Sequence, residues 1–177
     1  AVTGDILHKK GEEQEAFAAY DSCLQWKDDN VMALNNYAYY LSIKGTDLHK
    51  AESMSYKTIK AEPNNGTYLD TYAWILFMEE RYADAKTYID QALKNRDSTA
   101  DNSTVIEHAG DIYYMNGMAD ESVDFWKKAY TGENQTEVLA WKIKNRQYIT
   151  EEELKKRNAP KQKVAATKKS VRKGKKK

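Results

Sequence analysis

Four small residues recur along this chain at a nearly constant interval, each among larger apolar residues at helical spacing. They are Ala16, Ala51, Ala85 and Ser122, separated by 35, 34 and 37 residues. The polar linker DSTADNS at 97–103 accounts for the longer last interval. A period of this length with i, i+3, i+4 patterning is typical of stacked helical hairpins.

The clearest copy runs from Gly66 to Leu93. Its first half places four residues on one side of a helix, and after a short break a second amphipathic helix folds back on the first. The two sets are Leu69, Tyr72, Ala73 and Leu76, then Tyr82, Ala85, Ile89, Ala92 and Leu93. Similar patterns predict hairpins over 4–24, 31–60 and 103–130, with turns at Gly11, Gly45 and Gly117. Strand signals are nearly absent, which predicts an all-α chain.

A motif of small, aromatic and turn residues accompanies this period. Its members are Gly4, Gly11, Ala16 and Tyr20; Ala38, Gly45, Ala51 and Pro63; Ala73, Ala85 and Ala92; Gly110, Gly117, Trp126 and Ala129. On these residues the chain resembles the tetratricopeptide repeat (TPR) family over positions 1 to about 130. The resemblance implies a right-handed α-α superhelix of four TPR hairpins, although Glu80 replaces one turn glycine. The amino-acid sequence of the second and third copies resembles that of Bacteroidetes-type bacterial TPR proteins.

The domain organisation follows from the repeats. We expect a TPR domain over 1–158, with repeats at approximately 1–30, 31–65, 66–99 and 103–134 and capping helices at 135–157. One capping helix is expected from Thr136 to Ile149, and Thr150 with Glu153 predicts a capping box that opens a short charged helix. The first hairpin looks shortened, so further repeats are expected before Ala1, and its open face could also drive self-association.

One face of each hairpin's first helix is the candidate binding site. In the TPR family the corresponding face lines a concave surface that holds peptides or partner helices. The residues predicted to line it here are Asn35, Tyr39, Asp70, Trp74, Phe77, Met78, Glu107, Asp111 and Tyr114. They predict an aromatic trough edged with carboxylates, suited to a ligand with apolar anchors and a basic flank. The alternative is that Trp74 and Phe77 only pack between repeats.

The charge of the chain is divided unevenly. Residues 159–177 hold nine Lys or Arg and no acid; removing these from the total of 28 leaves 19 basic against 27 acidic residues, a net charge of −8 for the remainder. The tail's candidate contact residues are Lys168, Lys169, Arg172, Lys173, Lys175, Lys176 and Lys177. This basic tail is expected to be flexible, and it could bind nucleic acid, an anionic membrane or an acidic protein, dock in the acidic trough, or have no specific partner.

Several functions are disfavoured. Thr67 and Thr71 stand where the family's clamp for chaperone carboxylates needs cations, although Asn36 matches one clamp position. The three histidines lie in different copies, and Glu107, His108 and Asp111 share one helix without ligands from other elements, so we expect no metal. The single Cys23 is expected to be buried.

The resulting hypothesis is a non-catalytic scaffold without a cofactor, which binds a partner protein or peptide in the trough. The alternative is nucleic-acid or anionic-surface binding through the tail. No apolar run approaches the roughly 20 residues that span a bilayer. By family resemblance a periplasmic or outer-membrane-associated location is expected, with the cytoplasm as the alternative.

Overall fold

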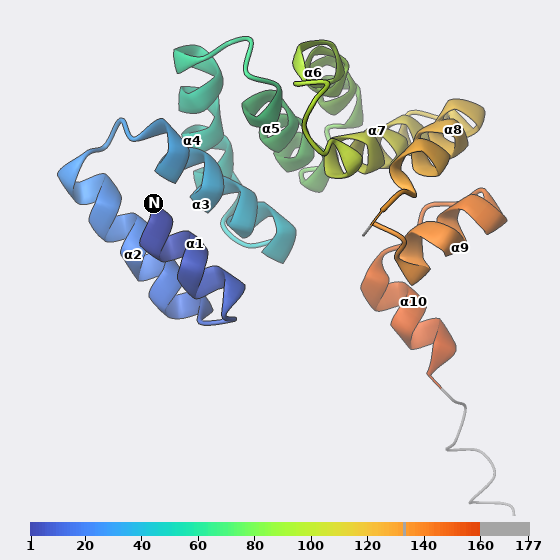
Figure 1. The fold of residues 1–177 in the computed structure, drawn as a ribbon, viewed down its shortest axis with the longest axis horizontal. Coiled ribbons are helices and arrows are strands. Elements are labelled where there is room, and N and C mark those ends of the chain that lie inside the picture. The colour runs from blue at the N-terminus through green and yellow to red at the C-terminus, as the bar shows by residue number, and fades with distance from the viewer. Residues whose placement is uncertain (133, 160–177) are drawn as a thin grey trace, which may run out of the picture. The chain divides into compact units, whose positions relative to one another are not determined.

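The computed structural model describes residues 1–132 and 134–159, which contain ten helices and no strand (Figure 1). The all-α prediction is therefore confirmed for this part of the chain. The helices are α1 (Val2–Lys9), α2 (Glu13–Trp26), α3 (Val31–Lys44), α4 (Leu48–Ala61), α5 (Gly66–Met78), α6 (Tyr82–Asn95), α7 (Ser103–Met115), α8 (Ala119–Ala129), α9 (Glu137–Asn145) and α10 (Glu151–Asn158).

The first eight helices pack as consecutive antiparallel pairs, α1 with α2, α3 with α4, α5 with α6 and α7 with α8 (Figure 1). The second helix of each pair contacts the first helix of the next, and the first helices α3, α5 and α7 also contact one another in sequence. Helix α9 packs on α8. These helices belong to a compact unit over Ala1–Gln147, while α10 belongs to a second unit that begins at Tyr148.

The four repeating small residues lie in the core of the structure. Ala16, Ala51, Ala85 and Ser122 are all fully buried. A residue four positions later on the same helix, Tyr20, Ser55, Ile89 or Trp126, is buried as well. This spacing places both residues on the helix face that meets the first helix of the hairpin.

The size of the residue on the first helix is matched to the size of the residue opposite it. A Cβ added at Gly4 would lie 2.6 Å from Tyr20 Cζ, and one added at Gly110 would lie 2.4 Å from Trp126 Cδ1. The two middle hairpins carry Ala38 and Ala73 at the equivalent position, where the second helices supply the smaller Ser55 and Ile89. In the first and fourth hairpins a large ring of the second helix therefore occupies the space that a Cβ on the first helix would need.

The turn between the paired helices requires a left-handed backbone conformation. Gly45 and Gly117 adopt it with φ of 67° and 78°, whereas the third hairpin has Glu80 at φ 61°. A residue with a Cβ pays roughly 1–2 kcal/mol for this conformation. The sequence departure noted at Glu80 therefore corresponds to local strain rather than to a different turn.

The C-terminal elements correct one prediction and confirm another. Helix α9 ends at Asn145, because Arg146 takes a left-handed conformation with φ 55°, so the expected extension to Ile149 is wrong. The capping box of Thr150 and Glu153 is confirmed at the start of α10. The seven residues predicted for the basic tail lie outside the described residues. No described helix combines the length and apolarity needed to cross a membrane.

Candidate functional site

The nine residues predicted for the first-helix face come from three adjacent helices, α3, α5 and α7. Four of them are buried, namely Asn35, Asp70, Phe77 and Asp111. Five are half-buried and reach solvent with part of their surface: Tyr39, Trp74, Met78, Glu107 and Tyr114. We keep the name first-helix face for the nine residues and call these five its accessible part.

The centre of the face is a stack of three rings. The Trp74 indole lies between the Phe77 ring, with centroids 4.7 Å apart, and the His108 imidazole, with centroids 4.1 Å apart. Tyr39 approaches the same imidazole with a centroid distance of 6.4 Å. Helices α3, α5 and α7 therefore meet at His108. Phe77 also contacts Tyr82 of α6 edge-on, which anchors the stack within its own hairpin.

The carboxylates of the face are paired within the fold. His108 Nδ1 lies 2.9 and 3.2 Å from the two Asp70 oxygens. Lys142 of α9 donates to both Asp111 oxygens at 2.8 Å and to Glu107 Oε1 at 3.1 Å. Trp126 Nε1 donates to Asp111 Oδ1 at 2.8 Å. The result is a chain of polar contacts from α5 through α7 to α8 and α9.

The protonation of His108 is set by this environment. Burial favours the neutral imidazole, but the charges of Asp70, Asp111 and Glu107 and the hydrogen bond to Asp70 outweigh it, so the pKa of His108 is raised. Burial, followed by the charge of Asp70, raises the pKa of the Tyr39 phenol to about 12. Tyr39 therefore remains neutral throughout the physiological pH range.

Two buried polar atoms of the face have no hydrogen-bond partner among the described residues. They are the Asn35 Oδ1 acceptor on α3 and the Trp74 Nε1 donor on α5. An unsatisfied buried amide-type group costs about 1–3 kcal/mol. Most buried polar groups in folded proteins are paired; among the described residues the Ser55 hydroxyl on α4 also has no partner, so two of three such atoms lie on the face.

Sequence analysis missed the roles of Lys142, His108 and Trp126 in this network. One signal pointed to it: the triplet Gly-Asp-Ile occurs at residues 4–6 and again at 110–112. In both copies an aromatic residue of the second helix donates to the aspartate, Tyr20 to Asp5 and Trp126 to Asp111. A repeated acid at a packing position indicates a structural partner for its charge.

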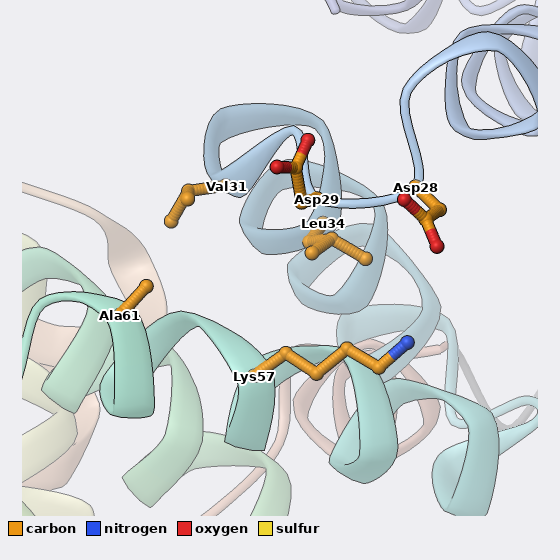
Figure 2. Close-up of a pocket in the computed structure, with 6 residues that line it drawn as sticks. All are labelled: Asp28, Asp29, Val31, Leu34, Lys57 and Ala61. Carbon is orange, nitrogen blue, oxygen red and sulfur yellow. The ribbon is translucent and has the colours of Figure 1, made fainter.

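A second location on the same compact unit has a different character. An open hollow of about 300 Å³ is lined by Asp28, Asp29, Val31, Leu34, Lys57 and Ala61, from the α2–α3 connection, α3 and α4. Figure 2 shows Lys57 extending along α4 toward the side on which Asp28 lies. Among the described residues no ion pair joins Lys57 to Asp28 or Asp29. Nothing in sequence analysis singled out this hollow.

Metal binding finds no support in the described part of the chain. Within residues 1–132 and 134–159, no three side chains of His, Cys, Asp or Glu are grouped so that they could hold an ion. The Glu107, His108 and Asp111 side chains that share α7 turn instead to Lys142, Asp70 and Trp126. Their arrangement combines ion pairs to α5 and α9 with a hydrogen bond inside the fourth hairpin.

Comparison with known proteins places this geometry in a wider group. No family model matches the chain. A TPR repeat-containing protein of Pseudomonas aeruginosa is 36% identical over 66 residues, which make up 37% of this chain and 11% of that protein. The matched segment is thus a small part of that relative.

Solved structures match more of the chain at lower identity. Pseudomonas aeruginosa PilF matches 81% of this chain and 64% of its own with a TM-score of 0.68 and 16% identity. MamA of Desulfovibrio magneticus matches 76% and 73% with 0.60 and 14%. YrrB, described as a TPR protein with an unusual peptide-binding site, matches 81% and 72% with 0.58 and 17%.

The chain is therefore a helical repeat protein built from stacked hairpins. Its fold is that of the tetratricopeptide repeat, as the residue pattern predicted.

Proposed function

We propose that this protein is a non-catalytic scaffold that binds a segment of a partner protein on the first-helix face. The observation that carries the proposal is the accessible part of that face, where Tyr39, Trp74 and Tyr114, on the first helices of three successive hairpins, are half-buried rather than buried. Aromatic rings of this kind supply much of the binding energy at protein interfaces.

The fold supports the same choice of site. First helices α3, α5 and α7 contact one another, so equivalent positions on them form a continuous surface longer than a single helix face. YrrB, which shares the fold, is described as having a peptide-binding site. We propose a peptide or helix as the ligand here too.

The test is a selection of random 12-residue peptides displayed on phage, with the intact purified chain as bait. Selected peptides are then measured by fluorescence anisotropy against the wild type, Trp74→Ala and the matched control Trp26→Ala, since Trp26 is 90% exposed at the end of α2, away from the face. We expect at least tenfold weaker binding to Trp74→Ala and unchanged binding to Trp26→Ala. Circular dichroism checks that both variants are folded.

Two results would contradict the proposal. One is a selection without peptides that distinguish the wild type from Trp74→Ala. The other is binding that depends on Trp26 instead. A third variant, ending at Asn158, separates contributions of the basic tail: peptides that need residues 159–177 would favour the alternative hypothesis of binding through the tail.

A further inference from the structure

The acidic side chains of the first-helix face are paired with other side chains of the same chain. Asp70 is 6% exposed and pairs with His108, while Asp111 is 3% exposed and pairs with Lys142 through both oxygens. Glu107, the half-buried carboxylate, shares the same lysine. Each acid predicted to edge the trough therefore already has a cationic or imidazole partner.

A basic ligand would have to compete with these partners. Lys142 is itself 3% exposed, and its ammonium is held by three carboxylate oxygens at 2.8 to 3.1 Å. Displacing one member of a buried pair leaves an uncompensated buried charge, which is strongly unfavourable. The basic flank that the sequence suggested for the ligand therefore has no free carboxylate to meet on this face.

The remaining accessible surface is neutral and apolar. Tyr39, Trp74, Met78 and Tyr114 offer rings and a thioether, and the Tyr39 phenol stays uncharged. Ile43 on α3, at the position equivalent to Met78, is 47% exposed. Aromatic and methionine side chains suit apolar partners, and methionine adapts its shape to them.

The two buried atoms of the face that lack a hydrogen-bond partner among the described residues also favour an uncharged ligand. Trp74 Nε1 is a donor and Asn35 Oδ1 is an acceptor, and a peptide bond supplies one acceptor and one donor. Both atoms are covered in the unbound molecule, so a ligand reaches them only when neighbouring side chains move. An uncharged amide matches the pair, whereas an ammonium or a carboxylate matches only one of the two atoms.

We propose that the segment bound by the first-helix face is an uncharged apolar polypeptide with aromatic or aliphatic anchors, and that basic residues add nothing to its binding. This inference rests on the proposed function and names its ligand class. It is the opposite of what the acidic net charge of residues 1–158 would suggest. Charge on the body of this protein and charge at its binding face are separate properties.

The test uses the same peptide selection and measures two things: the amino-acid composition of the selected peptides and the dependence of their affinity on salt concentration. Peptides that need Trp74 should be enriched in Leu, Phe, Tyr, Trp and Met, with Lys and Arg at or below their frequency in the starting library. Their affinity should change less than twofold between 50 and 500 mM NaCl, since neutral contacts are not screened.

Selection of basic peptides would overturn this inference about the ligand without overturning the proposed function. Trp74-dependent peptides that are enriched at least twofold in Lys and Arg, and that bind tenfold more weakly in high salt, would leave the proposed function standing and show that the ligand is basic. A selection with no Trp74-dependent peptides would overturn both, so the two failures are distinguished. Peptides enriched in Asp and Glu with strong salt dependence would also overturn it.

Discussion

The first and the fourth hairpins carry the same Gly-Asp-Ile triplet, but different neighbours satisfy its aspartate. In the fourth hairpin Asp111 receives Trp126 Nε1 and the ammonium of Lys142, and it is 3% exposed. In the first hairpin Asp5 receives the Tyr20 hydroxyl and, at 2.9 Å, the Asn36 amide, and it is half-buried. The same local motif becomes a buried ion pair in one place and a partly exposed hydrogen bond in the other.

The isoleucine of the triplet shows what a neighbouring hairpin contributes. Ile112, and Ile75 at the same position of the third hairpin, are fully buried, whereas Ile6 is 50% exposed. Val2 is 66% exposed, while its equivalents Thr71 and His108 are 3% and 7% exposed. In a stack of repeats each hairpin is stabilised by the one beside it, so identical residues differ in energetic weight along the chain.

The largest expected loss of stability comes from removing the buried partner of Asp111 in the fourth hairpin. Lys142→Met leaves Asp111 and Glu107 without their cation, which should cost about 3–5 kcal/mol of unfolding free energy. The matched change for Asp5 of the first hairpin is Asn36→Leu on α3, which removes the hydrogen bond to Asp5 and the one that Asn36 accepts from Asn35; it should cost about 1–2 kcal/mol. Urea unfolding monitored by circular dichroism compares them. Equal losses would show that burial does not separate the two motifs.

The next prediction concerns the glycine of the triplet. Gly110→Ala places a Cβ 2.4 Å from the Trp126 ring and should cost about 1–3 kcal/mol, despite the better helix propensity of alanine. Combining it with Trp126→Ile reproduces the Ala73 and Ile89 pairing of the third hairpin, and the double variant should recover part of the steric loss. A thermal or urea unfolding series measures this, and strictly additive losses would contradict the size matching.

A smaller effect of opposite sign is expected at the turn of the third hairpin. Glu80→Gly relieves the left-handed strain at φ 61° and should stabilise the chain by about 1 kcal/mol. Gly117→Ala introduces the same strain in the fourth hairpin and should destabilise it by a similar amount. If Glu80→Gly lowers the midpoint of urea unfolding, the glutamate has a role that the turn geometry does not include.

The smallest effect is a pH dependence at the junction of α5 and α7. The pKa of His108 is raised above 6.5 in the folded chain, so its stabilising contribution is complete below pH 6.5 and is lost as pH rises through the folded pKa. The groups that act on it are Tyr39, Asp70, Glu107 and Asp111.

The measurement is the unfolding free energy between pH 5.5 and 8.5 for the wild type, His108→Gln and the control His49→Gln, in which an exposed histidine is changed. His108→Gln should flatten the decline at rising pH, and His49→Gln should preserve it. A profile that keeps its slope in His108→Gln would show that other groups cause the dependence.

Sequence periodicity predicted the helices, the hairpin turns and the fully buried small residues, because each of these depends on contacts within one hairpin. It did not predict that Asp70 and Asp111 form ion pairs inside the fold, since their partners His108 and Lys142 lie on other helices. Nor did it place the end of α9, which depends on one backbone angle at Arg146. The assignment of the compartment, the use of the basic tail and the nine-residue binding face remain predictions.

The most direct test of binding at the first-helix face uses the four tryptophans as separate reporters. Their indole N–H signals in a ¹H–¹⁵N spectrum distinguish Trp74 on the face, Trp26 at the exposed end of α2, the fully buried Trp126, and Trp141 on α9. Titration with a selected peptide should move the Trp74 signal most and leave Trp26 unchanged. Movement of Trp26 with a stationary Trp74 would show that the ligand binds elsewhere and would contradict the account.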